Sequence, residues 1–248
     1  MAKASRGLAE QLTIPESPAP LLVPTAGIDG HRRRMRSRLL AAGPDALADH
    51  ELLEMLLYLA LPRRDTKALA RTLLLRFGSF AGTIAAPLAD LRRIEGLGDA
   101  AAAALKTVQV AALRLVRAEV VDRPVLTNWD RLMEYLNAVM AREQVEQFRV
   151  LFLDNRNCLL ADEAQGRGTV NHIPVYPREV VKRALELHAM AIILVHNHPS
   201  GDPTPSRADI DTTREIAEAA RIMSMALHDH IIVGNGKWFS MRQEGMLV

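Results

Sequence analysis

A chain of 248 residues, with 49% hydrophobic and 24% charged residues, has the composition of an ordinary globular protein with one or two domains. Its one cysteine, Cys158, excludes an intramolecular disulfide and a cysteine-based zinc site, and it fits a reducing cytoplasm. Every apolar run is well short of the roughly 18 residues that a membrane span needs. No apolar core follows Lys3 and Arg6, so we expect neither a membrane segment nor a signal peptide.

Charge is divided unevenly along the chain. Residues 1–124 hold 18 Lys+Arg and 13 Asp+Glu, a net charge of +5, whereas residues 125–248 hold 13 and 16, a net charge of −3. The mildly basic first half permits contact with nucleic acid without requiring it.

The N-terminal part begins with a proline-rich segment, residues 1–28, for which we expect a flexible tail. Five arginines then fall within the seven residues Arg32–Arg38. Such a cluster, which includes Arg33 and Arg34, is suited to grip phosphates, and it is equally typical of a solvated helix face.

Residues 29–122 predict a small all-α domain, because their apolar positions follow a helical period without strand alternation. Asp49 is the predicted N-cap of one helix, and Pro62 ends that helix. Gly78 closes the next one. The expected helices cover residues 49–61, 66–77, 86–95 and 99–117.

A Gly96-Leu97-Gly98 turn separates the last two of these helices. In helix-hairpin-helix modules, a turn of this kind lets main-chain amides at a helix N-terminus approach a DNA phosphate. A tight turn without any ligand has the same pattern. Asp99 follows directly and would repel a phosphate, so Gly96 and Gly98 are weaker DNA-binding candidates than the usual motif.

Residues 125–248 predict a second domain after the boundary at Asp122-Arg123-Pro124. Strands and helices mix there without strict alternation, which indicates an α+β fold. The expected helices cover 129–141, 177–187 and 207–225, and the expected strands cover 148–153, 158–162, 170–175, 191–196, 227–233 and 238–241.

His196, His198 and Asp209 form the strongest candidate site. The histidines are two residues apart at the end of an apolar run, so in a strand both imidazoles point to the same face. Three prolines stiffen the following loop, and Asp209 stands at the head of a helix. Two histidines and a carboxylate are the ligand set of a catalytic zinc, with a fourth position open for water. Taken separately, Ser206-x-x-Asp209 is also an ordinary capping box, and His-x-His is also compatible with two structural histidines.

These residues resemble a known family. His196-x-His198 followed by Ser206-x-x-Asp209 resembles the JAMM (MPN-plus) metalloprotease motif. The longer string HNHPSGDPTPSRADI, with PREVVKRAL before it and DHIIVG after it, resembles the RadC family, whose members are described as DNA repair proteins. The resemblance covers about residues 125–248 and extends less specifically over 30–120. It implies a cytidine-deaminase-like MPN α/β sandwich behind a helix-hairpin-helix-like domain.

The same resemblance implies the roles of the site residues. The two histidines and Asp209 would hold one Zn²⁺ at about 2.0–2.2 Å, and the metal would lower the pKa of a bound water to near 7. A glutamate just before an early strand would be the general base. Glu146 fits that position, and Glu143 and Glu163 are its rivals. Ser206 would donate to the developing oxyanion, a role commonly worth about 2.7–4 kcal/mol.

Metal-ligating histidines usually donate their second N–H to a carboxylate or carbonyl. Asp202 and Asp229 are the candidates for these partners. His228-Asp229-His230 is itself a His-x-His pattern, but no carboxylate at ligand spacing flanks it, so we expect a structural or supporting role.

Three functions are compatible with the sequence. The favoured one is a zinc metallopeptidase that cleaves a peptide or isopeptide bond. The alternative is a DNA-binding repair factor whose zinc site is structural or acts on nucleic acid, and the two can coexist if the N-terminal domain delivers a hydrolase to DNA-bound protein. A pure scaffold is disfavoured, because a scaffold has no need of an intact ligand triad.

Overall fold

The computed structural model describes residues 28–247, except for residue 122 and residues 168–174. The chain divides into two compact units, Met1–Leu47 and Ala48–Val248. The N-terminal tail expected over 1–28 and the strand expected over 170–175 lie almost entirely outside the described residues, and the domain division near residue 122 stays a prediction. Of the described helices, none reaches both the length and the apolarity that crossing a membrane requires.

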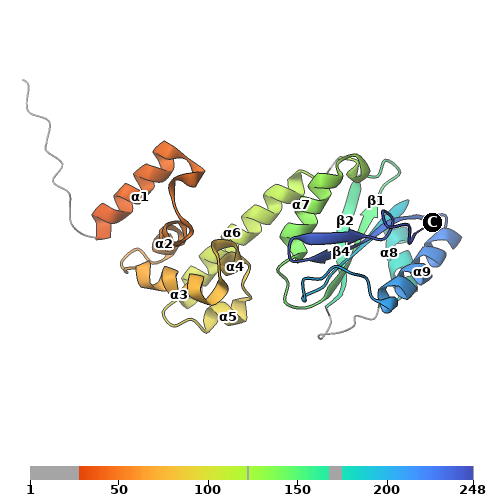
Figure 1. The fold of residues 1–248 in the computed structure, drawn as a ribbon. Coiled ribbons are helices and arrows are strands. Elements are labelled where there is room, and N and C mark those ends of the chain that lie inside the picture. Colours follow the sequence, from red (N-terminus) through yellow and green to blue (C-terminus); the bar gives the residue numbers. More distant parts are fainter. Residues whose placement is uncertain (1–27, 122, 168–174, 248) are drawn as a thin grey trace, which may run out of the picture. The chain divides into compact units, whose positions relative to one another are not determined.

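The first unit contains α1 (Ile28–Ala42) and the 3-10 helix η1 (Pro44–Ala46), shown in red and orange in Figure 1. Met35 and Arg32, three residues apart, are buried, because they share one side of α1. The remaining arginines of α1 are exposed: Arg33, Arg34, Arg36 and Arg38.

The second unit begins with a helical core. Its helices are α2 (Asp49–Ala60), α3 (Lys67–Phe77), α4 (Phe80–Ala85), α5 (Leu88–Arg92) and α6 (Gly98–Ala118). Leucines at helical spacing, among them Leu53, Leu57 and Leu105, are fully buried in this core. α3 ends at Gly78, as predicted, because its φ of 81° lies in the left-handed region that glycine adopts without steric cost.

A mixed five-stranded sheet forms the rest of the unit, after the 3-10 helix η2 (Val125–Thr127) and α7 (Trp129–Met140). Its order is β2-β1-β3-β4-β5 (Figure 1), with β1 (Gln147–Leu153), β2 (Leu159–Arg167), β3 (Ala191–Asn197), β4 (Ala226–Gly234) and β5 (Lys237–Ser240). β3 and β4 are parallel, and the other neighbouring pairs are antiparallel. Every residue of the central strand β3 is buried, as expected of a strand covered on both faces.

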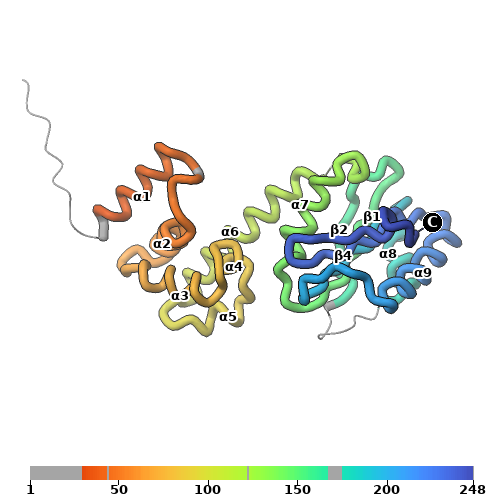
Figure 2. The backbone as a smooth tube through the Cα atoms, in the orientation of Figure 1, coloured from red at the N-terminus to blue at the C-terminus, as the bar shows by residue number. Residues whose placement is uncertain are grey.

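Helices cover both faces of this sheet (Figure 2). α7 packs on the face that carries Ile193 and Val195. α8 (Pro177–Glu186) and α9 (Arg207–Ile222) pack on the opposite face, against Ile192 and Leu194. Because parallel strands need a crossover, α9 connects β3 to β4, and its N-terminus begins near the carboxyl end of β3. The predicted α+β class, with helices before a mixed sheet, is confirmed.

The sequence missed α4, and the helix expected over 86–95 is the shorter α5. Three other predicted boundaries were also wrong. Asp49 is the first residue of α2 rather than its cap: the N-cap is Ala48, and the Asp49 carboxylate instead accepts a hydrogen bond from the Phe80 amide at 3.0 Å. β2 continues to Arg167, beyond the expected end at residue 162, because its polar residues pair through the main chain with β1. α9 ends at Ile222, because Ser224 has a φ of 57° that no helix accommodates.

Candidate metal centre

The structure brings His196, His198 and Asp209 together where β3 ends and α9 begins. His196 is within β3, opposite Phe148 of β1. The two rings are stacked nearly parallel, with their centroids 6.0 Å apart. His198 follows two residues later on the same side. Asp209 is the third residue of α9, so its carboxylate points back toward the end of the strand. Among the described residues, these three are the group of His, Cys, Asp and Glu side chains able to hold a metal ion.

The separations of the ligand atoms fit a tetrahedral ion. His196 Nε2 lies 2.9 Å from His198 Nε2. Asp209 Oδ1 lies 3.3 Å from His196 Nε2, and Asp209 Oδ2 lies 3.6 Å from His198 Nε2. Two ligands bound at about 2.1 Å to a tetrahedral zinc are about 3.4 Å apart. The side chains of His198 and Asp209 are 19% and 16% exposed, which leaves one side of the cluster open to solvent.

Electrostatics within the cluster favour a cation. Burial opposes ionisation of Asp209, but hydrogen bonds from His196 and His198 outweigh it, and the pKa of the carboxyl lies well below its usual range. The hydrogen bond to Asp209 raises the pKa of His198, and the negative charge of Glu146 adds to this effect. An anionic carboxylate beside two imidazoles is the donor set that zinc prefers.

The loop after His198 fixes the orientation of its ring. His198 Nδ1 lies 2.7 Å from the main-chain carbonyl oxygen of Asp202, and the His198 amide donates to the Val233 carbonyl. The loop lies flat on the end of β4, because a side chain at Gly234 would come within 2.5 Å of the Gly201 carbonyl oxygen. A carbonyl only accepts, so His198 Nδ1 carries a hydrogen, and Nε2 is the ring nitrogen that faces the cluster.

The supporting partner of His196 comes from β4. His196 Nδ1 lies 2.8 Å from His230 Nε2, and His230 Nδ1 lies 2.5 Å from the Thr213 hydroxyl of α9. Burial lowers the pKa of His230 well below its usual value. His230 therefore has the supporting role predicted for it.

The two aspartates expected as supporting partners behave differently. Asp202 supports His198, but through its main-chain carbonyl rather than its carboxylate. Asp229 was the wrong candidate: its carboxylate accepts hydrogen bonds from the Ser240 hydroxyl at 2.5 Å and from the Arg242 amide at 3.0 Å. Asp229 therefore secures the C-terminal turn. The residue that contacts the candidate ligand His196 is its neighbour His230.

Comparison with known proteins decides the family. A family model described as a RadC-like JAB domain matches residues 126–246, and one described as UPF0758 N-terminal matches residues 30–103. A UPF0758 protein of Rhodobacter capsulatus is 56% identical over 213 residues, which cover 86% of this chain and 100% of the relative. The chain belongs to the UPF0758 family. Within that family, a UPF0758 protein of Ruegeria pomeroyi is 51% identical over 89% of this chain and 98% of its own length. The RadC resemblance is therefore confirmed.

Glu146 immediately precedes β1, and its two rivals have other neighbours. The register that pairs Phe148 with His196 would, if continued, place Glu146 beside His198. Glu163 forms a two-pronged ion pair with Arg183, at 2.6 and 2.8 Å. Glu143 lies near Lys106 of the helical core. Burial lowers the pKa of Lys106, and the negative charge of Glu143 offsets part of that shift.

Asn197, between the two histidines, was not singled out in the sequence. Its side chain is directed to the opposite face from theirs and is buried. The Asn197 Oδ1 accepts from the Gln147 amide at 2.9 Å, and its Nδ2 donates to the carbonyls of Val145 at 3.2 Å and Glu143 at 3.4 Å. One side chain thus ties the segment 143–147 to the strand that carries the two candidate histidine ligands.

Ser206 caps α9. Its Oγ accepts from the Asp209 amide at 3.2 Å, and its own amide donates to the Asp209 carboxylate at 2.7 Å. The capping box weighed as an alternative is therefore present. Capping uses the Ser206 oxygen as an acceptor, which leaves its hydroxyl hydrogen available for donation.

The Gly96–Gly98 turn has a structural explanation. Gly96 has a φ of 77°, and a side chain there would lie 2.3 Å from the guanidinium of Arg64, which donates to the Gly96 carbonyl. Asp99 pairs with Arg92 at 3.1 Å. The positive φ therefore accounts for the glycine, whether or not the turn contacts DNA.

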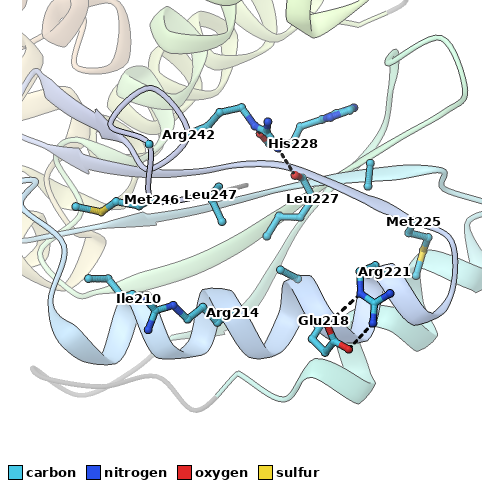
Figure 3. Close-up of a pocket in the computed structure, with 13 residues that line it drawn as sticks. Ile210, Arg214, Glu218, Arg221, Met225, Leu227, His228, Arg242, Met246 and Leu247 are labelled. Carbon is cyan, nitrogen blue, oxygen red and sulfur yellow. Dashed lines mark hydrogen bonds and ion pairs between the residues drawn. The ribbon is translucent and has the colours of Figure 1, made fainter.

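A groove of about 1020 Å³ runs along α9, between this helix and the C-terminal residues (Figure 3). Arginines border its apolar floor, but each has partners. Arg221 pairs with Glu218 at 2.7 Å, and Arg242 donates to the main-chain carbonyl of Leu227 at 3.1 Å. These pairings are typical of a structural surface, and we assign the groove no ligand.

Proposed function

We propose that this protein is a zinc-dependent hydrolase of the JAMM type that cleaves a peptide or isopeptide bond. One observation carries the proposal: ligand atoms of His196, His198 and Asp209 converge at tetrahedral spacing in a chain with a RadC-like JAB domain. Two imidazoles and one carboxylate leave a fourth position, as catalytic zinc sites do. When bound, the zinc would acidify a water and polarise the scissile carbonyl.

Glu146 is the proposed general base. Its position before β1, the anchoring of its segment by Asn197 and its effect on the pKa of His198 support the assignment. The carboxylate would take the proton from the attacking water and pass it to the leaving amine. Glu163 is a poor alternative, because the ion pair with Arg183 already engages both of its oxygens.

Ser206 is the proposed oxyanion donor. It is exposed at the start of α9, three residues from Asp209, and its hydroxyl hydrogen is not needed for capping. A donor that faces the oxygen of the tetrahedral intermediate stabilises the transition state more than the ground state. We therefore expect Ser206→Ala to lower kcat more than it raises KM.

Metal analysis combined with one matched set of variants tests the function. We expect about one zinc per chain, and hydrolysis of fluorogenic peptide or isopeptide substrates that falls about 10²–10⁴-fold in Glu146→Gln while the zinc remains bound. Glu143→Gln and Glu163→Gln are the controls and should hydrolyse nearly as well as the native chain. Purified protein without stoichiometric metal, or an active Glu146→Gln variant, would refute the mechanism.

Contact with nucleic acid is a second candidate, favoured by the exposed arginines of α1. Arg33 and Arg34 are the residues proposed to contact phosphates, whereas Arg32 is 7% exposed and is left out of the contact. We expect the full chain to bind DNA with an affinity that falls as salt concentration rises. In Arg33→Ala/Arg34→Ala, the slope of the logarithm of the binding constant against the logarithm of the salt concentration should decrease in magnitude by about 1 for each phosphate that is no longer neutralised. Arg178→Ala/Arg221→Ala removes the same charge elsewhere and is the control. Absence of binding at low salt would eliminate this function.

A further inference from the structure

A cleft of about 560 Å³ lies between the helical core and the loops at the end of the sheet that carries the metal cluster. One wall comes from α3 and α4, and the other comes from the segment 141–144 before β1 and the loop after His198. All of these residues belong to the second compact unit. Val116 of α6 packs against the core between α7 and the sheet, so α6 connects the two walls.

The cleft is adjacent to the proposed catalytic residues along the chain. Residues 199–201 line it and follow the candidate ligand His198 directly, and the lining segment 141–144 ends just before the proposed base Glu146. Consecutive Cα atoms are about 3.8 Å apart, so the Ser200 Cα lies within about 8 Å of the His198 Cα. An extended polypeptide advances about 3.3 Å per residue. A substrate whose scissile bond faced the cluster would therefore reach the cleft within a few residues.

Two arginines supply the positive charge of the cleft, Arg76 from α3 and Arg142 from the segment after α7. Both are exposed, and in the part of the chain that the structure describes neither forms an ion pair. Among the described residues that line the cleft, Glu143 is the single acid, and Lys106 lies near enough to offset its charge. In the groove along α9, by contrast, arginine is paired with glutamate. The cleft therefore presents two guanidinium groups that a ligand can engage.

The remaining polar side chains of the cleft are neutral. Gln144, Ser200 and Asn235 contribute amide and hydroxyl groups, which can donate to a carboxylate or pair with a peptide main chain. A guanidinium matches the two oxygens of a carboxylate and binds them through paired hydrogen bonds. Nucleic acid has a regular row of phosphates and is bound by a row of cations. Two arginines among neutral polar groups fit the side chains of an acidic peptide better.

We infer that this cleft binds the part of the substrate beside the scissile bond and selects a polypeptide that has acidic side chains there. Arg76 and Arg142 are the residues that determine this specificity, each by pairing with a carboxylate. The inference rests on the proposed function for the statement that the bound peptide is a substrate. Binding of an acidic peptide in the cleft requires no hydrolysis, so it can be measured separately.

Peptide binding tests the cleft directly. The probe is a short fluorescein-labelled peptide in which glutamate alternates with serine, and its anisotropy is followed with full-length protein that carries Glu146→Gln to keep the peptide intact. We expect tighter binding than for the counterpart with glutamine in place of glutamate. Arg76→Ala/Arg142→Ala should weaken binding of the glutamate peptide about three- to tenfold, as expected for two partly exposed ion pairs, and leave the glutamine peptide unchanged.

Arg71→Ala/Arg114→Ala is the matched control. It removes two exposed arginines from α3 and α6 that do not line the cleft, and it should leave the affinity for both peptides unchanged. Charge reversal separates recognition from folding: Arg76→Glu/Arg142→Glu should prefer the lysine counterpart of the peptide to the glutamate peptide, a reversal that loss of structure does not explain.

Three results would overturn the inference. They are equal affinity for the glutamate and glutamine peptides, equal weakening by the control pair, and tighter binding of a labelled single-stranded oligonucleotide that depends on Arg76 and Arg142. In each case hydrolysis dependent on Glu146 could still stand. Selective binding of the glutamate peptide by a protein that hydrolyses no peptide would instead refute the proposed function and leave the cleft as a peptide-binding site.

Discussion

Removing the Asn197 side chain is the sharpest test of how the site is built. Asn197→Ala would delete three hydrogen bonds that hold segment 143–147 beside β3. At about 1 kcal/mol each, they amount to about 3 kcal/mol of folding free energy, because the freed Gln147 amide is buried. Since Asn197 contacts none of the ligand atoms, we expect zinc to remain bound while Glu146 loses its fixed position and kcat falls.

Hydrogen exchange measures this effect at a single atom. The Gln147 amide should lose its protection in Asn197→Ala and keep part of it in Asn197→Asp, whose carboxylate accepts from the amide but cannot donate to the Val145 carbonyl. Asn137→Ala is the control, because the side-chain oxygen of Asn137 is buried without a hydrogen-bond partner in α7. Unchanged Gln147 protection and unchanged unfolding free energy in Asn197→Ala would refute the reasoning.

Three further outcomes are expected. Zinc at 100 times its Kd should stabilise the chelator-treated protein by about 2.7 kcal/mol, and Asp209→Asn should remove most of that gain in thermal unfolding. Burial lowers the pKa of His228, so below the ordinary value of about 6.5 the unfolded state takes up a proton that the folded state refuses. As pH falls from that value, the unfolding free energy of the metal-free protein should decrease by up to about 1.4 kcal/mol per pH unit more than that of His228→Gln. Denaturant titrations at several pH values measure both slopes, and equal slopes would contradict the prediction. The ion pair with Arg183 lowers the pKa of Glu163, so its stabilisation is present above the ordinary carboxyl pKa and is lost as pH falls through the lowered value. Because the pair is partly exposed, Glu163→Gln should cost at most about 1 kcal/mol at neutral pH, and a larger loss would indicate a further role.

The sequence predicts elements well where side chains set their limits. Gly78 and Pro62 end helices as expected, because their constraints are local. β2 was predicted too short because its second half, EAQGR, has no apolar alternation, and an edge strand needs only the main-chain groups of one neighbour. Asp49 failed as a cap because Phe80, 31 residues away, competes for its carboxylate.

The same distinction applies to the candidate site. The cluster of His196, His198 and Asp209 was predictable, because its spacing of 13 residues from His196 to Asp209 is local. The partners of these ligands were not. Asn197 reaches Gln147 across 50 residues, and His230 meets His196 across 34, so both depend on strand register that no local pattern specifies.

The fit of the loop against Gly234 limits how this region can change in length. Surface loops usually tolerate insertions, but the segment between His198 and Ser206 is attached at the Val233 carbonyl, and its Gly201 carbonyl lies directly against Gly234. An added residue there would displace Asp209 relative to the histidines. The same constraint extends to the exposed turn at Asn235, because a side chain at Gly201 would lie 3.2 Å from the Asn235 Cβ, so we expect extra segments that adapt the protein to a different substrate elsewhere on its surface.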